Sequence, residues 1–169
     1  MSRTKSPVLW ISTVVVVLAA AIGLYLFQPW RLLTTERVDE AAPVATDGQG
    51  AAQAKQVANG SFISHEHETS GSVEIQRLAD GTATLRLTNL RTSDGPALHV
   101  WLSDQPVKQD GGGNLDDGKY VDLGDLKGNE GNQNYAIPQG TDLNTFSTVT
   151  IWCERFSVSF GAAELKQLT

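Results

Sequence analysis

The chain has 169 residues, with 13 basic and 19 acidic side chains and a formal net charge of −6. This length allows one ordinary domain with additional segments. Such an acidic surface repels phosphate backbones, so we expect no binding to nucleic acids. The single cysteine, Cys153, excludes an intramolecular disulfide framework.

Residues 8–27 form an apolar run that follows a short basic segment, residues 1–7. The run has the length of about 20 residues that a helix needs to span a bilayer. Trp10 lies near one end, and Tyr25 and Trp30 lie near the other, as in an aromatic belt. The sequence therefore predicts a transmembrane helix over 8–27 that acts as an uncleaved signal-anchor.

A cleavable signal peptide is the alternative, with small residues at 19–21 as a cut site. The apolar run continues past that point to Phe27, which favours the anchor. Arg3, Lys5 and the terminal amine precede the run, and Arg31 and Arg37 follow it. By the positive-inside rule this slight excess predicts a cytoplasmic N-terminus, residues 1–7. We expect a single-pass protein of the cell membrane with its C-terminal domain outside the cytoplasm.

Residues 28–58 connect the helix to the rest of the chain. Their last two thirds are rich in Ala, Gln and Gly and show no apolar period. This composition is typical of a flexible linker.

Residues 59–169 show short alternating segments separated by turn signals. Val73 and Ile75 alternate with polar residues, Asp80-Gly81 is a hairpin signal, and Leu98, Val100 and Leu102 leave His99 and Trp101 on the opposite face. No long amphipathic helix is visible, which argues against a parallel βαβ architecture. The sequence therefore predicts an all-β domain, an antiparallel β-sandwich, preceded by one N-terminal transmembrane helix and a flexible linker.

The C-terminal stretch carries the cysteine. Val149, Ile151 and Cys153 alternate with polar or aromatic residues, so we expect them on one face of a strand over 147–153. Residues 156–160 indicate a second half-buried strand. Residues 154–155 form either a bend or bulge within one strand or a turn between two strands. Residues 161–163 and the tail are expected to turn briefly helical.

This stretch is also the centre of a family resemblance. It resembles the DM-thirteen domain of the electron transfer DM family, which also occurs in Skeletor-type proteins. The resemblance covers about residues 59–168. It rests on four separated segments in order, 95–103, 120–124, 126–135 and 151–163. The resemblance implies redox work through a cysteine, here Cys153, with His99 as a weaker candidate.

Two interpretations of Cys153 are open. Its position beside Ile151 favours an inert buried thiol, because free cysteine is among the most buried residue types. A redox thiol needs access and a lowered pKa from a nearby cation such as Arg155. The first interpretation makes the protein a non-enzymatic interaction or envelope-structural module. The second makes it an electron-transfer accessory domain with a redox partner protein, rather than a self-contained enzyme.

Cofactors remain open. The chain lacks Cys-x-x-Cys and Cys-x-x-Cys-His motifs, which excludes thioredoxin-like chemistry and covalent haem attachment. Met1 is the only methionine, so the domain offers no methionine axial ligand to haem or copper. A lone cysteine can still exchange with a cysteine on another chain. Copper, zinc and non-covalently bound haem are not excluded.

Three histidines are candidate metal ligands. His65 and His67 would share one face if they lay on a strand, and with His99 and Cys153 they could form a copper or zinc site. Solvated polar residues are the competing interpretation. The acidic loop 104–118 is expected to face water rather than to bind calcium, because its spacing does not match an EF-hand.

Overall fold

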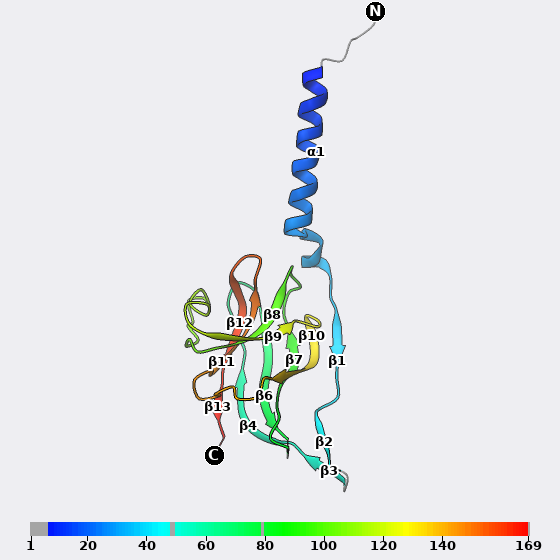
Figure 1. Ribbon diagram of the computed structural model, residues 1–169. Coiled ribbons are helices and arrows are strands. Elements are labelled where there is room, and N and C mark those ends of the chain that lie inside the picture. Colours follow the sequence, from blue (N-terminus) through cyan, green and yellow to red (C-terminus); the bar gives the residue numbers. More distant parts are fainter. Residues whose placement is uncertain (1–6, 48–49, 79, 169) are drawn as a thin grey trace, which may run out of the picture.

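The computed structural model describes residues 7–47, 50–78 and 80–168. An apolar helix stands apart from a β-structured domain (Figure 1). Helix α1 is Pro7–Phe27, and a short 3-10 helix, η1, is Pro29–Leu33. The helical segment 7–31 is long and apolar enough to cross a membrane, and a signal sequence would pass the same test. Of the predicted cytoplasmic segment, residues 1–6 lie outside the described residues.

The domain consists of two packed sheets, which confirms the predicted β-sandwich. One sheet has six strands in the order β1-β10-β7-β6-β4-β13, and the other has five in the order β5-β12-β11-β8-β9. Strands β2 and β3 form a separate hairpin. The strands are β1 Arg37–Asp39, β2 Val44–Asp47, β3 Gly50–Gln53, β4 Lys55–Ser61, β5 Ile63–Ser64, β6 Ser70–Arg77, β7 Ala83–Arg91, β8 Leu98–Ser103, β9 Tyr120–Asp125, β10 Glu130–Ile137, β11 Thr148–Cys153, β12 Val158–Glu164 and β13 Lys166–Gln167.

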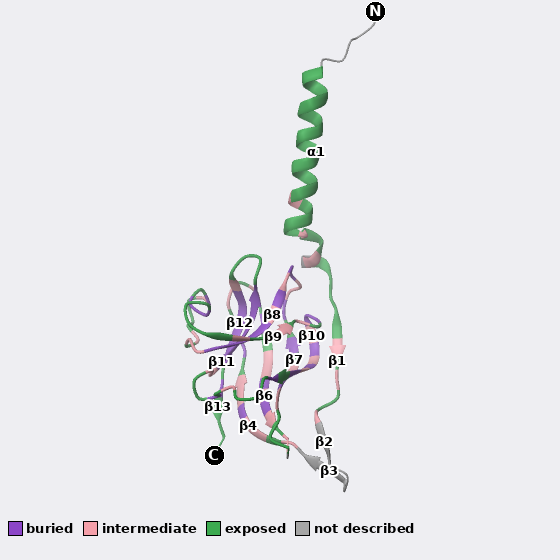
Figure 2. Cartoon of the chain, viewed as in Figure 1, coloured by how far each residue is buried: buried purple, intermediate pink, exposed green. Residues whose placement is uncertain are grey.

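The core lies between the two sheets, and the helix is exposed along its length (Figure 2). Burying an aliphatic side chain of this kind contributes about 1.5–3 kcal/mol. The predicted alternation is confirmed, because the even-numbered positions of β8 and the odd-numbered positions of β11 face this core. Fully buried members include Val73, Ile75, Leu85, Leu87, Val100, Leu102, Val149 and Ile151.

A second apolar cluster covers the outer face of the five-stranded sheet. It contains Trp101, Trp152, Ala162 and Leu115. Leu115 comes from the long loop between β8 and β9, and its carbonyl accepts a hydrogen bond from the Ser103 hydroxyl at 2.7 Å. The loop that sequence alone described as solvated is therefore fixed to the sheet through Leu115, and Val107 of the same loop packs against the cluster as well.

The C-terminal stretch is a hairpin. Strands β11 and β12 pair antiparallel, so residues 154–157 form a turn between two strands. The expectation that residues 161–163 turn helical was wrong, because Ala162 and Ala163 pair with Thr150 and Val149. Phe156 also differs from the expected half-buried strand over 156–160, since it lies in the turn and is 43% exposed.

The segment expected to be a flexible linker differs from that expectation. It contains η1, β1 and the β2–β3 hairpin, and β4 begins at Lys55, ahead of the expected boundary at residue 59. Strand β1 pairs parallel with β10, in which Val38 lies opposite Gly131. Backbone pairing of this kind needs no apolar period, so the composition of the segment did not reveal it.

Candidate functional site

Cys153 is the last residue of β11 and lies in the core between the sheets. Its side chain is 0% exposed and packs in the cluster that contains Val149 and Ile151, as predicted. The thiol donates a hydrogen bond to the Pro96 carbonyl at 3.2 Å. Burial raises the pKa of the thiol, and the backbone N–H groups of Phe156 and Arg155 oppose that rise in part. In this conformation the thiol therefore lacks the access and the lowered pKa of a reactive cysteine.

The turn 154–157, which follows Cys153, contacts the end of helix α1. Arg155 donates to the carbonyl oxygens of Leu26 at 2.8 Å and of Tyr25 at 3.4 Å. The ring of Phe156 stacks on Phe27 with centroids 5.7 Å apart. A cation near the last carbonyls of a helix satisfies their acceptors and complements the helix dipole. The β11–β12 hairpin is thus placed at the domain end of the apolar helix.

The segment after η1 is bound to the domain by glycines and asparagines of the β9–β10 connection. Asn129 accepts the Glu36 N–H at 2.7 Å and donates to the Thr92 carbonyl at 2.9 Å. Gly128 and Gly131 leave no room for a side chain, because a Cβ at either would overlap the carbonyl of Glu36 or Val38. These residues belong to the segment 126–135 that carries the family resemblance. In the structure these residues bind the chain that leads from the helix, or leave room for its close approach.

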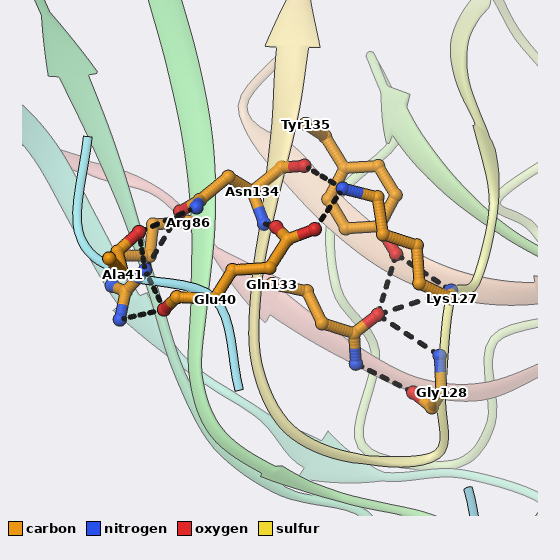
Figure 3. A network of polar contacts seen from close by, with 8 residues as sticks. All are labelled: Glu40, Ala41, Arg86, Lys127, Gly128, Gln133, Asn134 and Tyr135. Carbon is orange, nitrogen blue, oxygen red and sulfur yellow. Dashed lines mark hydrogen bonds and ion pairs between the residues drawn. The ribbon is translucent and has the colours of Figure 1, made fainter. Parts of the chain in front are cut away.

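A network of charged and polar groups continues this attachment on the residues that follow β1 (Figure 3). The Glu40 carboxylate accepts from Lys127 Nζ at 2.7 Å and from the Asn134 N–H at 2.6 Å. Lys127 lowers the pKa of Glu40 through this contact. The guanidinium of Arg86, which is only 9% exposed, donates to the carbonyls of Glu40 and Ala41. These bonds join the segment that follows β1 to β7 and β10.

Gln133 is the buried centre of the same region (Figure 3). Its Oε1 accepts the N–H groups of Lys127 and Gly128 at 3.1 and 3.2 Å and the Tyr135 hydroxyl at 2.8 Å. Its Nε2 donates to the Gly128 carbonyl at 2.6 Å. Burial raises the pKa of Tyr135, so the hydroxyl stays a donor. One amide side chain therefore fixes the loop that binds the segment between α1 and the sandwich.

A row of stacked aromatic rings crosses the outer face of the five-stranded sheet. Tyr120 stacks on Trp101 with centroids 3.9 Å apart, and Trp101 stacks on Trp152 at 5.0 Å. Both tryptophans are nearly fully buried, whereas Tyr120 is 47% exposed. The row therefore leads from the buried face beside β11 to the surface. The alternation of β8 predicted the face of Trp101 but not its neighbours, which come from two other strands.

His99 lies on the same outer face. It is opposite Trp152 of β11, and it is in ion-pair distance of Asp122 and Asp125 of β9 and of Glu154 in the turn. Sequence analysis missed these three carboxylates, because they become neighbours of His99 only when β9, β8 and β11 pair. The alternation of Tyr120–Asp125 was the one available signal for the face of Asp122.

His65 and His67 lie elsewhere, in the bend after β5 rather than on a strand. The ring of His65 contacts the Ser159 hydroxyl at 2.8 Å and the Lys108 carbonyl at 3.0 Å. The ring of His67 packs on Phe160 with centroids 3.8 Å apart, and burial lowers its pKa. Among the described residues, the group with ligand atoms close enough to hold a metal contains His99, but neither of these histidines nor Cys153.

Together these features define a β-sandwich domain that is fastened to the end of an apolar helix long enough to span a membrane. A family model described as "Electron transfer DM13" matches residues 61–165. The chain therefore belongs to the electron transfer DM13 family, which confirms the resemblance seen in the sequence. No curated protein and no solved structure matches the chain.

Proposed function

We propose that this protein is a membrane-anchored accessory domain for electron transfer, with its globular part outside the cytoplasm. Membership of the electron transfer DM13 family carries the electron-transfer part of the proposal. The apolar helix and its contacts with Arg155 and Phe156 support a domain held close to the bilayer. A redox partner would then meet the domain at the membrane surface.

We propose further that Cys153 is the redox centre and that the turn 154–157 shields it. The thiol can reach a partner only when this turn opens, because its side chain is fully covered in the closed form. In an exchange reaction, the Cys153 thiolate attacks a disulfide of the partner, forms a mixed disulfide and releases the partner's other sulfur as a thiolate. The Cys153 thiol first loses its proton to solvent. The exchange needs no other oxidant, because the partner's disulfide bond breaks as the mixed disulfide forms.

The second candidate function is a non-enzymatic interaction module in which Cys153 only packs. The full burial of the side chain and its hydrogen bond to Pro96 favour this alternative. The two functions differ in the motion that exposes the thiol. A shielded redox thiol is exposed by local opening of the turn, whereas a core thiol is exposed only by global unfolding.

Thiol labelling of the intact chain in detergent micelles separates them. We expect native Cys153 to react much more slowly than in denaturant, but faster than the measured rate of global unfolding. The double variant Arg155→Ala, Phe156→Ala frees the turn from α1, so it should speed labelling without changing the unfolding rate. The matched control Lys119→Ala changes an exposed cation away from the turn and should leave labelling unchanged. If labelling proceeds at the rate of global unfolding in both proteins, Cys153 is a core residue and its redox role is wrong.

The orientation can be tested with a single introduced cysteine, because native Cys153 is covered. Lys119→Cys places a thiol on the exposed loop of the domain. We expect a membrane-impermeant maleimide to label it on intact cells. The control Ser2→Cys, on the other side of the apolar run, should be labelled only after the membrane is permeabilised. The reverse pattern would place the domain in the cytoplasm.

A further inference from the structure

We propose that His99, Asp122 and Glu154 bind a divalent transition-metal ion. One ligand atom from each of these side chains lies within 4.8 Å of the other two. His99 is on β8 and Asp122 on the adjacent strand β9, while Glu154 directly follows β11 on the other side of β8. Three neighbouring backbones of one sheet therefore hold the three donors in place.

The surroundings of the His99 ring supply an independent argument. Its Nδ1 lies 3.1 Å from an Asp122 oxygen, and its Nε2 lies 3.3 Å from Asp125 and 3.5 Å from Glu154. A neutral imidazole has one N–H group. In the neutral ring, one nitrogen would therefore present its lone pair to carboxylate oxygens. A metal ion bound at that nitrogen turns this repulsion into coordination.

The charge of the cluster points to the same kind of ligand. Three carboxylates gather around one imidazole, and among the described residues no Lys or Arg makes an ion pair with any of them. Such a local excess of negative charge concentrates cations. The backbone also holds the Asp122 side chain in its orientation, because its Oδ1 accepts the Gly124 N–H at 2.8 Å. Supporting hydrogen bonds of this kind hold metal ligands in position.

The donor atoms decide which cation fits. An imidazole nitrogen selects zinc, copper, iron or nickel over calcium and magnesium, which prefer oxygen donors alone. Cys153 supplies no sulfur, because its thiol faces the core on the opposite side of the sheet. The site is thus a nitrogen–oxygen site, in place of the nitrogen–sulfur site that the sequence suggested. Its carboxylates are partly exposed, so solvent can complete the coordination. The inference stands apart from the role of Cys153 and from electron transfer.

The experiment uses the full chain, purified without a histidine tag and freed of metal with a chelator. It is titrated with Zn²⁺ in a calorimeter and with Cu²⁺ in an EPR spectrometer. We expect one ion per chain and a copper spectrum split by a single imidazole nitrogen. His99→Gln should weaken binding at least about 100-fold, and Asp122→Asn and Glu154→Gln by about 10–100-fold each.

His67→Gln is the matched control, because it removes an imidazole of the same domain outside the cluster. It should leave the affinity and the copper spectrum unchanged. Unfolding curves of the metal-free variants show whether each one is folded. Unchanged affinity in folded His99→Gln would overturn the proposal, as would equal losses in His99→Gln and His67→Gln. Binding of several ions with no single-nitrogen spectrum would also overturn it.

Discussion

Replacing Gly131 with alanine is expected to release strand β1 from the sheet and to lower the free energy of unfolding by about 1–3 kcal/mol. Two effects combine at this position. The backbone of Gly131 has φ +104°, a conformation that residues with a Cβ rarely adopt. A Cβ would also overlap the Val38 carbonyl, which belongs to the strand that pairs there. The collision is with backbone, so it cannot be relieved by rotating a side chain.

Gly124→Ala separates these two effects. Gly124 has a similar φ of +110° in strand β9 of the other sheet, but nothing lies within 4 Å of a Cβ built there. It should therefore show the conformational cost without the release of β1. Chemical denaturation measures the stability of both variants, and amide hydrogen exchange at residues 36–40 reports the pairing of β1. Equal protection of these amides in Gly131→Ala and Gly124→Ala would contradict the collision.

The pairing of β1 matters because it sets how closely the chain holds the sandwich to the end of α1. With β1 bound, the chain from Phe27 to the sandwich is short, and the turn 154–157 stays against the end of α1. With β1 released, residues 28–54 would act as the longer linker that composition alone suggested. The same substitution therefore also tests whether the turn is held in place by α1, through the labelling rate of Cys153.

Sequence was most informative where one face of a strand is buried. The alternation at 98–102 and 149–153 correctly separated the core side from the side of His99 and Trp101. It failed at Phe156, because an aromatic residue in a turn that packs on a helix continues the same alternating pattern. It also failed at 161–163, since a Gly-Ala-Ala stretch carries no strand signal of its own and is held in β12 by pairing with β11.

The site could be predicted only in part for a related reason. His99 was a candidate, but Asp122 and Glu154 join it through the order of the strands β9, β8 and β11, which local patterns do not encode. His65 and His67 were paired by their spacing, which requires a strand, and the chain bends there instead. The burial of Cys153 was one of two open interpretations, and the side chain is fully buried in the core between the sheets.

Replacing Gln133 with leucine is expected to cost about 3–5 kcal/mol, the largest effect of any single change considered for this domain. Leucine matches the volume of glutamine but offers no hydrogen bond. Three buried groups would lose their partner at once: the Gly128 N–H, the Gly128 carbonyl and the Tyr135 hydroxyl. The Lys127 N–H would keep the Tyr135 oxygen, 3.1 Å away, as an acceptor. A buried polar group left without a partner costs about 1–3 kcal/mol, and the gain from burying leucine offsets only part of the sum.

Tyr135→Phe is the matched control, because it removes the hydroxyl but leaves the other bonds of Gln133 intact, including the one from the Lys127 N–H. It should cost about 1 kcal/mol, the usual value of a single hydrogen bond. Urea denaturation of the full chain measures both variants under the same conditions. A loss below about 1 kcal/mol for Gln133→Leu would mean that water replaces the amide, and that the loop does not depend on Gln133. If the large loss is found, the Gln133 amide determines the shape of the loop at 127–133. That loop binds the segment that leads from α1.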